Sequence, residues 1–323
     1  MLLTRRVAMM LKFGLIALVA GTASGQEYPT KPIRIVAAEH GGNGDFTARL
    51  IAQGLSDSFG QQVIVDNRGG SMVGVAQIVT KAVPDGYTLL LHGTTVWLLP
   101  LTQDNVPYDP VKDFSAITMA VSGPTVLVVH PSVAANSVKE LIALAKSKPG
   151  ALNYASAPTG STSHLTMELF KAMADINVVR IPYKGTGPAM NALIAGETQL
   201  MFPAAGGVSP HIKSGRLRAL AVTSARPSAL FPELPTVAAA GLPGYESVSI
   251  IGILAPAKTP AAIVNRLNQE SIKVLNRVDI KEKFLRNGME TVGSSPKEFS
   301  EKIRSEMSKW GKLIQQLGIR GNI

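Results

Sequence analysis

Short apolar runs followed by longer segments of helical spacing recur along most of the chain. β-Branched runs at 33–37 and 63–65 have strand length, and each precedes a segment whose apolar residues recur every three or four positions. The pattern predicts strands at 33–37, 63–65, 87–91, 126–129, 153–156, 179–181, 199–202, 217–223 and 250–255. It predicts helices at 46–59, 73–82, 137–148, 162–174, 188–195, 208–214, 260–275, 280–287 and 296–317. This alternation predicts an α/β fold with two mainly parallel sheets flanked by helices.

The strand and helix pattern restarts twice, which predicts two lobes. It begins again at Val126, and a stretch rich in proline and glycine from Pro227 to Gly244 precedes the last third of the chain. We therefore expect one lobe from residues 26–125 together with 228–323, and a second lobe from residues 126–227. Two chain crossings would form a two-strand hinge between the lobes.

The N-terminal 25 residues have the order of a secretory signal. Arg5, Arg6 and Lys12 are followed by an apolar run at 13–21 and by small residues at 22–25. The apolar run is well short of the about 20 residues that a spanning helix needs. We expect residues 1–25 to be cleaved after export by the general rather than the twin-arginine route; an uncleaved anchor is the alternative.

Composition excludes several classes of protein. The chain contains no cysteine, so disulfides, thiolate metal sites and cysteine nucleophiles are impossible. The net charge is +10, and its excess lies at 126–227 with +6 and at 228–323 with +4, whereas 26–125 carries −3. Lysine and arginine are dispersed and aromatic residues are only 5%, which disfavours nucleic-acid binding. Binding of a small anion and an ordinary solvated surface are the remaining interpretations.

Loops rich in glycine, serine and threonine follow five of the expected strands. Ligands bind beyond the carboxyl ends of such strands, where helix N-termini present unpaired N–H groups to anions. Ordinary helix capping would explain any one of these loops, but their shared sheet edge predicts an anion site. Candidate ligand-binding residues are Glu39, His40, Gly41, Gly42, Asp45, Thr94, Ser156, Thr159, Gly160, Ser161, Ser163, Thr186, Gly187 and Ala204.

Motifs for catalysis are weak. The chain has neither a Gly-Lys-Ser/Thr phosphate loop nor a Gly-x-Ser-x-Gly elbow, and its five histidines show no metal-ligand spacing. Ser161 and His164 suggest a nucleophile and base, but a helix cap and a packing residue explain them more simply. Lys184 is interpreted as a surface or hinge cation. We therefore expect no catalytic residues, no metal and no cofactor.

A series of motifs in order along the chain resembles the Bug-type solute receptors of tripartite tricarboxylate transporters. The motifs include Tyr28-Pro-Thr-Lys-Pro-Ile-Arg-Ile, Gly60-Gln-Gln-Val-Ile-Val-Asp-Asn-Arg68, Ala82-Val-Pro-Asp-Gly-Tyr-Thr-Leu-Leu90, Val106-Pro-Tyr-Asp-Pro-Val-Lys-Asp-Phe114, Leu152-Asn-Tyr-Ala-Ser-Ala157, Pro182-Tyr-Lys-Gly185 and Leu234-Pro-Thr-Val237. The resemblance implies a two-lobed periplasmic binding protein of type II, a Venus flytrap that closes on a small carboxylate. It also implies delivery of that ligand to a permease of one large and one small subunit.

Two loops depart from the pattern of that family. In that family the loop after the first strand resembles Pro-Phe-Pro-Pro-Gly-Gly-x-x-Asp. In this chain Gly41, Gly42 and Asp45 match that pattern, whereas Glu39 and His40 do not. His40 could donate to a second anionic group and Glu39 could pair with an amine, or both could face solvent. Asp45 is expected to act through a water or as a backbone cap, since an ionised carboxylate repels another. Pro203-Ala204-Ala205 stands where many relatives have Asp-Asn.

The expected function is that of a monomeric, non-enzymatic receptor. One ligand carboxylate is expected to bind the loops at 41–45 and 159–163, with Thr94 and the turn at Thr186 and Gly187 completing the pocket. Dicarboxylates, tricarboxylates, aromatic acids, amino acids and nicotinate-like compounds stay open as ligands. A receptor for a membrane sensor kinase, an exported α/β enzyme and a structural envelope protein are the alternatives.

Overall fold

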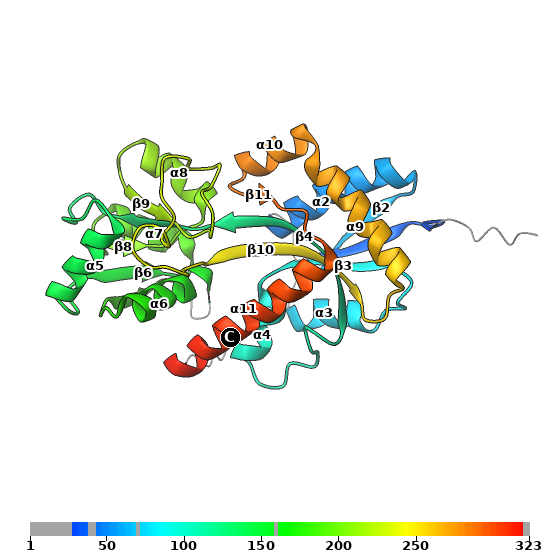
Figure 1. Ribbon diagram of the computed structural model, residues 1–323, viewed down its shortest axis with the longest axis horizontal. Coiled ribbons are helices and arrows are strands. Elements are labelled where there is room, and N and C mark those ends of the chain that lie inside the picture. Colours follow the sequence, from blue (N-terminus) through cyan, green and yellow to red (C-terminus); the bar gives the residue numbers. More distant parts are fainter. Residues whose placement is uncertain (1–27, 38–42, 69–71, 158–160, 319–323) are drawn as a thin grey trace, which may run out of the picture.

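The computed structural model describes residues 28–37, 43–68, 72–157 and 161–318, and two β-sheets lie along its long axis (Figure 1). The six-stranded sheet and its helices form the first lobe. Its strands are β1 (Ile33–Ala37), β2 (Val63–Asn67), β3 (Thr88–Gly93), β4 (Phe114–Pro124), β10 (Val248–Pro256) and β11 (Glu290–Thr291). Its helices are α2 (Asn43–Phe59), α3 (Met72–Thr80), α4 (Thr95–Thr102), α9 (Ala261–Asn276), α10 (Val278–Arg286) and α11 (Pro296–Leu317).

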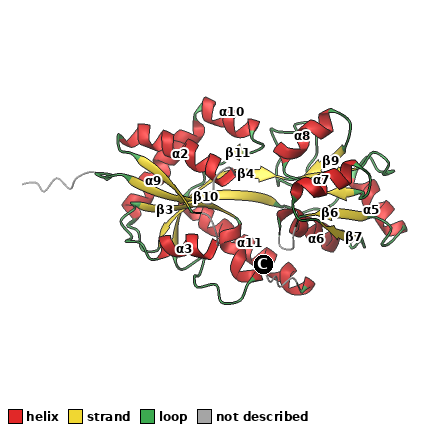
Figure 2. Ribbon diagram, turned by 180° about the vertical axis from the view of Figure 1, so that it is seen from behind, coloured by secondary structure: helices red, strands yellow, loops and turns green. Residues whose placement is uncertain are grey.

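The five-stranded sheet and its helices form the second lobe. Its strands are β5 (Val126–Val129), β6 (Asn153–Ser156), β7 (Val179–Pro182), β8 (Leu200–Met201) and β9 (Arg218–Val222). Its helices are α5 (Val138–Ser147), α6 (Thr162–Ala174), α7 (Thr186–Ile194) and α8 (Ala205–Lys213). Helices therefore lie against the sheet in both lobes, as the alternating pattern predicts (Figure 2).

Both sheets are mixed, which corrects the expectation of mainly parallel sheets. The first sheet has the order β11-β4-β10-β3-β1-β2, and only the pairs of β1 with β2 and with β3 are parallel. The second has the order β7-β6-β8-β5-β9, in which β6 pairs in parallel with β7 and β8 while β5 pairs antiparallel with β8 and β9. The chain leaves the first lobe along β4 and returns along β10, so these two strands run in opposite directions.

The hinge consists of the end of β4 and the start of β10, which pair at Pro124 and Val248 where the chain crosses between the lobes (Figure 1). Thr125 connects β4 to β5, and its backbone N–H donates to the Thr223 hydroxyl at 2.9 Å. The Thr223 N–H donates in return to the Thr125 carbonyl at 3.0 Å. Strand β4 occupies residues 114–124. The apolar pattern predicted no element there.

The return crossing lies later in the chain than the expected boundary at residues 227 and 228. Val237 N–H donates to the Val222 carbonyl of β9 at 2.9 Å, and the Tyr245 hydroxyl donates to the Thr166 carbonyl of α6 at 2.8 Å. Phe231 packs in the apolar core of the second lobe. These contacts place the stretch before β10 with the second lobe, so we move the boundary to the start of β10.

Alternating side chains of the first sheet enter two different apolar layers. Ile33 and Ile35 of β1 pack with α2 and α9, whereas Val36 packs with the layer that includes Trp97 of α4 and Trp310 of α11. This two-sided burial explains the continuous apolar runs in the sequence. Within the described ranges, no helix is both long enough and apolar enough to cross a membrane. The expected signal at 1–25 lies outside the described residues.

Candidate ligand-binding cleft

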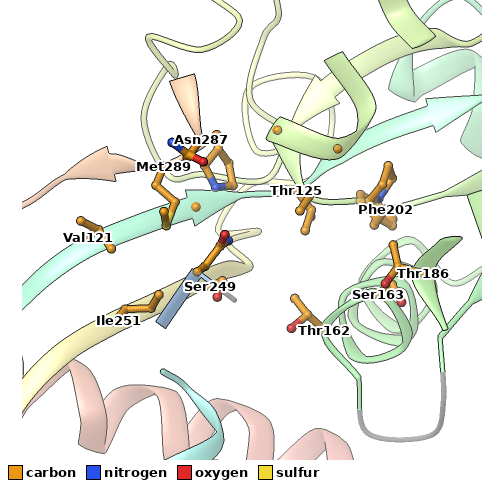
Figure 3. A pocket seen from close by; sticks show the side chains of 18 of the residues that line it. Val121, Thr125, Thr162, Ser163, Thr186, Phe202, Ser249, Ile251, Asn287 and Met289 are labelled. Atoms are coloured by element: carbon orange, nitrogen blue, oxygen red, sulfur yellow. The ribbon is translucent and has the colours of Figure 1, made fainter. Parts of the chain in front are cut away.

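A cleft of about 680 Å³ lies between the two lobes, with the hinge strands along it (Figure 3). The described residues that line it come from both lobes and from the hinge. They are Asn43, Thr95, Val121, Gly123, Pro124, Thr125, Ala157, Ser161, Thr162, Ser163, Thr186, Phe202, Pro203, Ala204, Gly206, Gly207, Ser249, Ile251, Arg286, Asn287, Gly288 and Met289. The size suits a small organic ligand, because such sites typically measure about 300–1,000 Å³.

Five helices begin at this cleft. Asn43 opens α2 and Thr95 opens α4 in the first lobe, while α6, α7 and α8 reach it from the second lobe with Thr162, Thr186 and the residues around Gly206. The first four N–H groups of a helix have no partner within the helix, and the dipole adds partial positive charge there. The cleft therefore collects backbone donors that favour an anion, which no single helix end would bind strongly.

The start of α6 is held in shape by its own serines. The Ser161 hydroxyl caps the helix by accepting from the His164 N–H at 3.4 Å, which confirms the expected cap. The Ser163 hydroxyl accepts from the Ala157 N–H at 3.1 Å and lies 3.3 Å from the Ser161 hydroxyl oxygen. Thr162 is exposed between them and lines the cleft. The loop end is thus positioned before any ligand arrives.

Arg180 of β7 supports this loop from behind. Its Nε donates to the Ser156 hydroxyl at 2.8 Å, and a terminal nitrogen donates to the Ala157 carbonyl at 3.1 Å. Ser156 is fully buried. Among the described residues, neither Arg180 nor Ser156 is in the cleft wall, and the Ser156 hydroxyl is a partner of Arg180.

The His164 imidazole carries no charge at neutral pH. Burial, followed by the nearby Arg180, lowers the pKa of its imidazole to about 4. The ring is almost completely buried, and Ser161 meets the backbone N–H of His164 as its cap. The pair therefore has the roles of cap and packing residue rather than those of nucleophile and base.

Two expected residues of the first lobe bond to the scaffold. Asp45 is buried in the first turn of α2, where its Oδ1 accepts from Arg49 Nε and from Asn67 Nδ2, both at 2.9 Å. The Thr94 hydroxyl accepts from the Ile250 N–H at 3.1 Å, which ties the end of β3 to β10. Neither is among the described cleft residues, and Thr95 occupies the position expected for Thr94.

Several cleft residues were missed because they are far apart in the sequence. Gly123 and Thr125 belong to the outgoing hinge segment, and Ser249 and Ile251 to the returning one. The last residue of α10, Arg286, reaches the rim, where its guanidinium pairs with Glu282 at 3.3 Å and is largely exposed. The apolar run before Val126 could have revealed β4, but only the folded chain places it beside the turn at 286–289.

Two glycines bring the lobes into backbone contact at the same rim. Gly288, with a φ of +72°, lies against Gly206 in the first turn of α8, and a Cβ at Gly288 would come 2.3 Å from the Gly206 nitrogen. A Cβ at Gly206 would meet the Asn287 carbonyl oxygen at 3.0 Å. No other residue type fits this approach without moving the lobes apart.

The expected site residues thus divide into three groups. Ser161, Ser163, Thr186 and Ala204 line the cleft, whereas Gly187 is exposed beside Thr186 without being among its described walls. Asp45, Thr94 and Ser156 hold the scaffold. Glu39, His40, Gly41, Gly42, Thr159 and Gly160 lie outside the described residues. Across the described part of the chain, no group of three or more histidine or acidic residues is placed to hold a metal ion.

Two α/β lobes joined by a two-strand hinge around a polar cleft define a two-lobed solute-binding protein. Residues 47–319 match the model of the tripartite tricarboxylate transporter family receptor, TctC. The chain is 34% identical to protein BugT of Bordetella pertussis over 98% of this chain and 99% of BugT. It is 36% identical to a protein from the tcbD-tcbE intergenic region of a Pseudomonas strain, over 91% and 89% of the two chains. The protein belongs to this receptor family, whose members are solute-binding receptors and not enzymes.

Solved structures of relatives have the same fold. Rhodopseudomonas palustris Rpa4515 with adipate has a TM-score of 0.73 and 34% identity, covering 91% of this chain and 99% of its own. The periplasmic binding protein BugD has a TM-score of 0.69 and 30% identity, with coverage of 91% and 99%. MatC of R. palustris with bound malate has a TM-score of 0.68 and 26% identity, with coverage of 89% and 100%. These likenesses confirm the expected class of two-lobed binding protein.

Proposed function

We propose that this protein captures a small organic carboxylate in the cleft and delivers it to the permease of a tripartite transporter. The observation that carries the proposal is the arrival of five helix N-termini, from both lobes, at one cleft. Backbone N–H groups there favour negative charge. The relatives whose structures contain adipate and malate support a carboxylate, since both of those ligands are dicarboxylates.

The second-lobe wall is proposed to bind one carboxylate directly. Ser161, Ser163, Thr186 and Ala204 provide hydroxyls and first-turn N–H groups along that wall, and Gly187 extends the turn. Ser156 supports this wall through Arg180, and Asp45 and Thr94 hold the facing elements of the first lobe through the contacts described above. Glu39, His40, Gly41, Gly42, Thr159 and Gly160 complete the proposed site, with Glu39 and His40 setting the preference among acids.

Closure of the two lobes is proposed to depend on contacts to the ligand from both sides. A ligand shifts the balance between open and closed forms only by the difference in its binding free energy for the two forms. The first lobe contributes Asn43, Thr95 and the rim at Arg286, and the second contributes the starts of α6, α7 and α8. We further propose that residues 1–25 direct a monomeric protein to the periplasm and are removed there.

Calorimetry and thermal unfolding of the mature protein with a panel of acids test this function. The panel contains monocarboxylates, dicarboxylates, tricarboxylates and aromatic acids, each with its neutral amide as the matched control. An acid at 100 times its Kd should stabilise the fold by about 2.7 kcal/mol, and its amide should not. Equal stabilisation by acids and amides, or by neither, would contradict carboxylate binding. Native mass spectrometry of the freshly purified protein would identify an acid that co-purifies.

The proposed role of Glu39 and His40 has its own test within the same panel. Glu39→Ala and His40→Ala together should change the rank order of acids more than the melting temperature of the free protein. An unchanged rank order would place both side chains away from the ligand. A receptor that serves a sensor kinase would have the same cleft, and would be distinguished by loss of signalling with uptake intact.

A further inference from the structure

A second cavity of about 90 Å³ lies beside the cleft, between α4, α6 and α11. Thr95 and Thr162 line both spaces, and both residues are exposed, so they stand where the two meet. The start of β10 contributes Val248 to the wall. The second cavity is therefore reached from the end of the cleft at which α4 and α6 begin.

Beyond the two exposed threonines, apolar side chains from the interior of the protein form much of the wall of this second cavity. Leu98 and Leu99 come from α4, Leu165 from α6 and Trp310 from α11, and each is less than one-tenth exposed. The main cleft, by contrast, is lined by helix starts and by several glycines. An apolar surface next to a site for anions favours a ligand with one charged and one apolar end.

Apart from Thr95 and Thr162 at the entrance, the hydroxyl residues that line the second cavity bond within the protein. Thr166 and Ser247 lie 2.6 Å apart between their hydroxyl oxygens, and both residues are buried. The Thr102 hydroxyl donates to the Leu99 carbonyl at 3.2 Å, and the Thr94 hydroxyl is bonded to the backbone of Ile250. These groups offer a polar guest little to bind, because burying a polar group without a partner is unfavourable.

We infer that the second cavity receives the aliphatic chain of a carboxylate whose charged end lies in the main cleft; this rests on the proposed function. The volume selects a chain rather than an aromatic ring. A cavity of about 150 Å³ lined by apolar side chains holds benzene, and this one is smaller, at about 90 Å³. The ligand class is therefore an acid with an unbranched alkyl chain, entering between Thr95 and Thr162.

Calorimetry with linear monocarboxylates from acetate to octanoate tests this inference on the full mature chain. Each methylene that enters the second cavity should tighten binding about fourfold until the cavity is full, the value expected for burial of one CH₂ group. Branched and aromatic acids of equal carbon number should bind more weakly than the best linear acid. Trp310 gives a second readout, because its fluorescence should change with chain length, and Trp310→Phe should remove that signal.

Leu98→Phe and Leu98→Ala change the size of the second cavity in opposite directions. Leu98→Phe should abolish the dependence on chain length, and Leu98→Ala should extend it to longer acids. Leu50→Phe is the matched control, because Leu50 lies on α2 and lines neither cavity among the described walls. Leu165→Phe fills the cavity from α6 should Leu98→Phe fail to fold, which circular dichroism would reveal.

The possible outcomes separate this inference from the proposed function. A length dependence that Leu98→Phe abolishes and Leu50→Phe retains would support the aliphatic site. Affinity independent of chain length in the wild-type protein, with acids still bound, would overturn this inference alone. Failure of every acid to bind the wild-type protein would overturn the proposed function together with it.

Discussion

The main cleft and the second cavity share Thr95 and Thr162 but present opposite surfaces. The cleft is bordered by helix N-termini, whose first N–H groups lack partners within the helix. In the second cavity the Thr166 and Ser247 hydroxyls bond to each other. Two polar groups in neighbouring spaces between the lobes can therefore have different roles. A polar group already satisfied by the protein stabilises the fold, whereas one left open to the cleft is available to a ligand.

The largest effect is expected from Gly288→Ala at the rim of the main cleft. The new Cβ would stand 2.3 Å from the Gly206 nitrogen, and these backbone atoms can separate only if the lobes move apart. We expect the affinity for a bound acid to fall more than about tenfold, the effect of roughly 1.4 kcal/mol. Calorimetry measures the affinity, and small-angle X-ray scattering measures the separation of the lobes.

Gly244→Ala is the control for Gly288→Ala. Gly244 also has a positive φ, +82°, but its Cβ would meet nothing within 4 Å. Both variants should lose about 1–2 kcal/mol of unfolding free energy from backbone strain at a positive φ, and only Gly288→Ala should lose affinity. Equal affinities in the two variants would mean that the glycine contact has no part in closure.

Thr166→Val tests whether the paired hydroxyls of the second cavity stabilise the fold. It leaves the buried Ser247 hydroxyl without its partner at 2.6 Å, so the unfolding free energy should fall by about 1–3 kcal/mol. Adding Ser247→Ala should restore part of that loss, because no unpaired hydroxyl then remains. Urea unfolding of both single variants and the double variant measures this. A double variant less stable than either single variant would contradict the explanation that the unpaired Ser247 hydroxyl causes the loss.

Thr186→Val and Ser161→Ala remove cleft hydroxyls that the proposed function assigns to the ligand. A net hydrogen bond contributes about 0.5–1.5 kcal/mol, so each variant should bind acids roughly two- to tenfold more weakly. Ser161→Ala also removes the cap of α6, which should lower stability by about 1 kcal/mol. Isothermal calorimetry measures affinity, and chemical unfolding measures stability.

Ser137→Ala separates the cap from the ligand contact. Ser137 caps α5 in the same lobe by accepting from the Glu140 N–H at 3.2 Å, and it is not among the described cleft residues. It should lose the same stability as Ser161→Ala and retain full affinity. If the two variants bind acids equally well, Ser161 is a cap without a role in binding.

The last prediction concerns the pH dependence due to His164, which lies between the cleft residue Ser163 and the cavity residue Leu165. Burial and Arg180 lower its folded-state pKa to about 4, below the 6.5 of an unperturbed imidazole. Between these pH values the unfolded chain binds a proton that the folded chain excludes. The stability that His164 contributes is therefore present above pH 6.5 and is lost as the pH falls towards 4.

Urea unfolding between pH 4 and 8 measures this contribution. The slope due to His164 is at most about 1.4 kcal/mol per pH unit, and His164→Gln should reduce it. An identical pH profile in the variant would assign the acid sensitivity of the protein to other groups. His130→Gln is the matched control, because His130 is partly exposed and bonds locally to Ser132 at 2.7 Å.

Local signals predicted many elements well. Helices α6 and α11 begin and end where the pattern places them, because Ser161 caps the first and Ser295 with Glu298 forms a capping box for the second. Strand β4 was missed although it has 11 residues. It pairs with β10 from Phe114 to Pro124, with two irregularities in register, and its end borders the cleft, so a single local pattern does not describe it.

The candidate site was predictable in part, for a definite reason. Loops before helices can be found in the sequence, and four of the expected residues, Ser161, Ser163, Thr186 and Ala204, do line the cleft. Adjacent residues of one loop were not distinguished, since Thr94 bonds to β10 while Thr95 faces the cleft. Which of two neighbours faces a ligand depends on backbone direction, and the direction depends on the strand against which the loop packs.

The sequence alone was enough to predict the helix caps, the helical and strand periods, the loops rich in glycine and hydroxyl residues, and the family. These depend on interactions between residues a few positions apart, or on motifs read in order. Only the tertiary structure decided that Gly288 would touch Gly206, that Ser247 would pair with Thr166, and that Trp310 would line a space beside Thr162. Those contacts join residues about 80 to 150 positions apart. Gly288 and Trp310 reach the second lobe because two hinge strands join the lobes, whereas Ser247 reaches Thr166 because the stretch before β10 packs against α6.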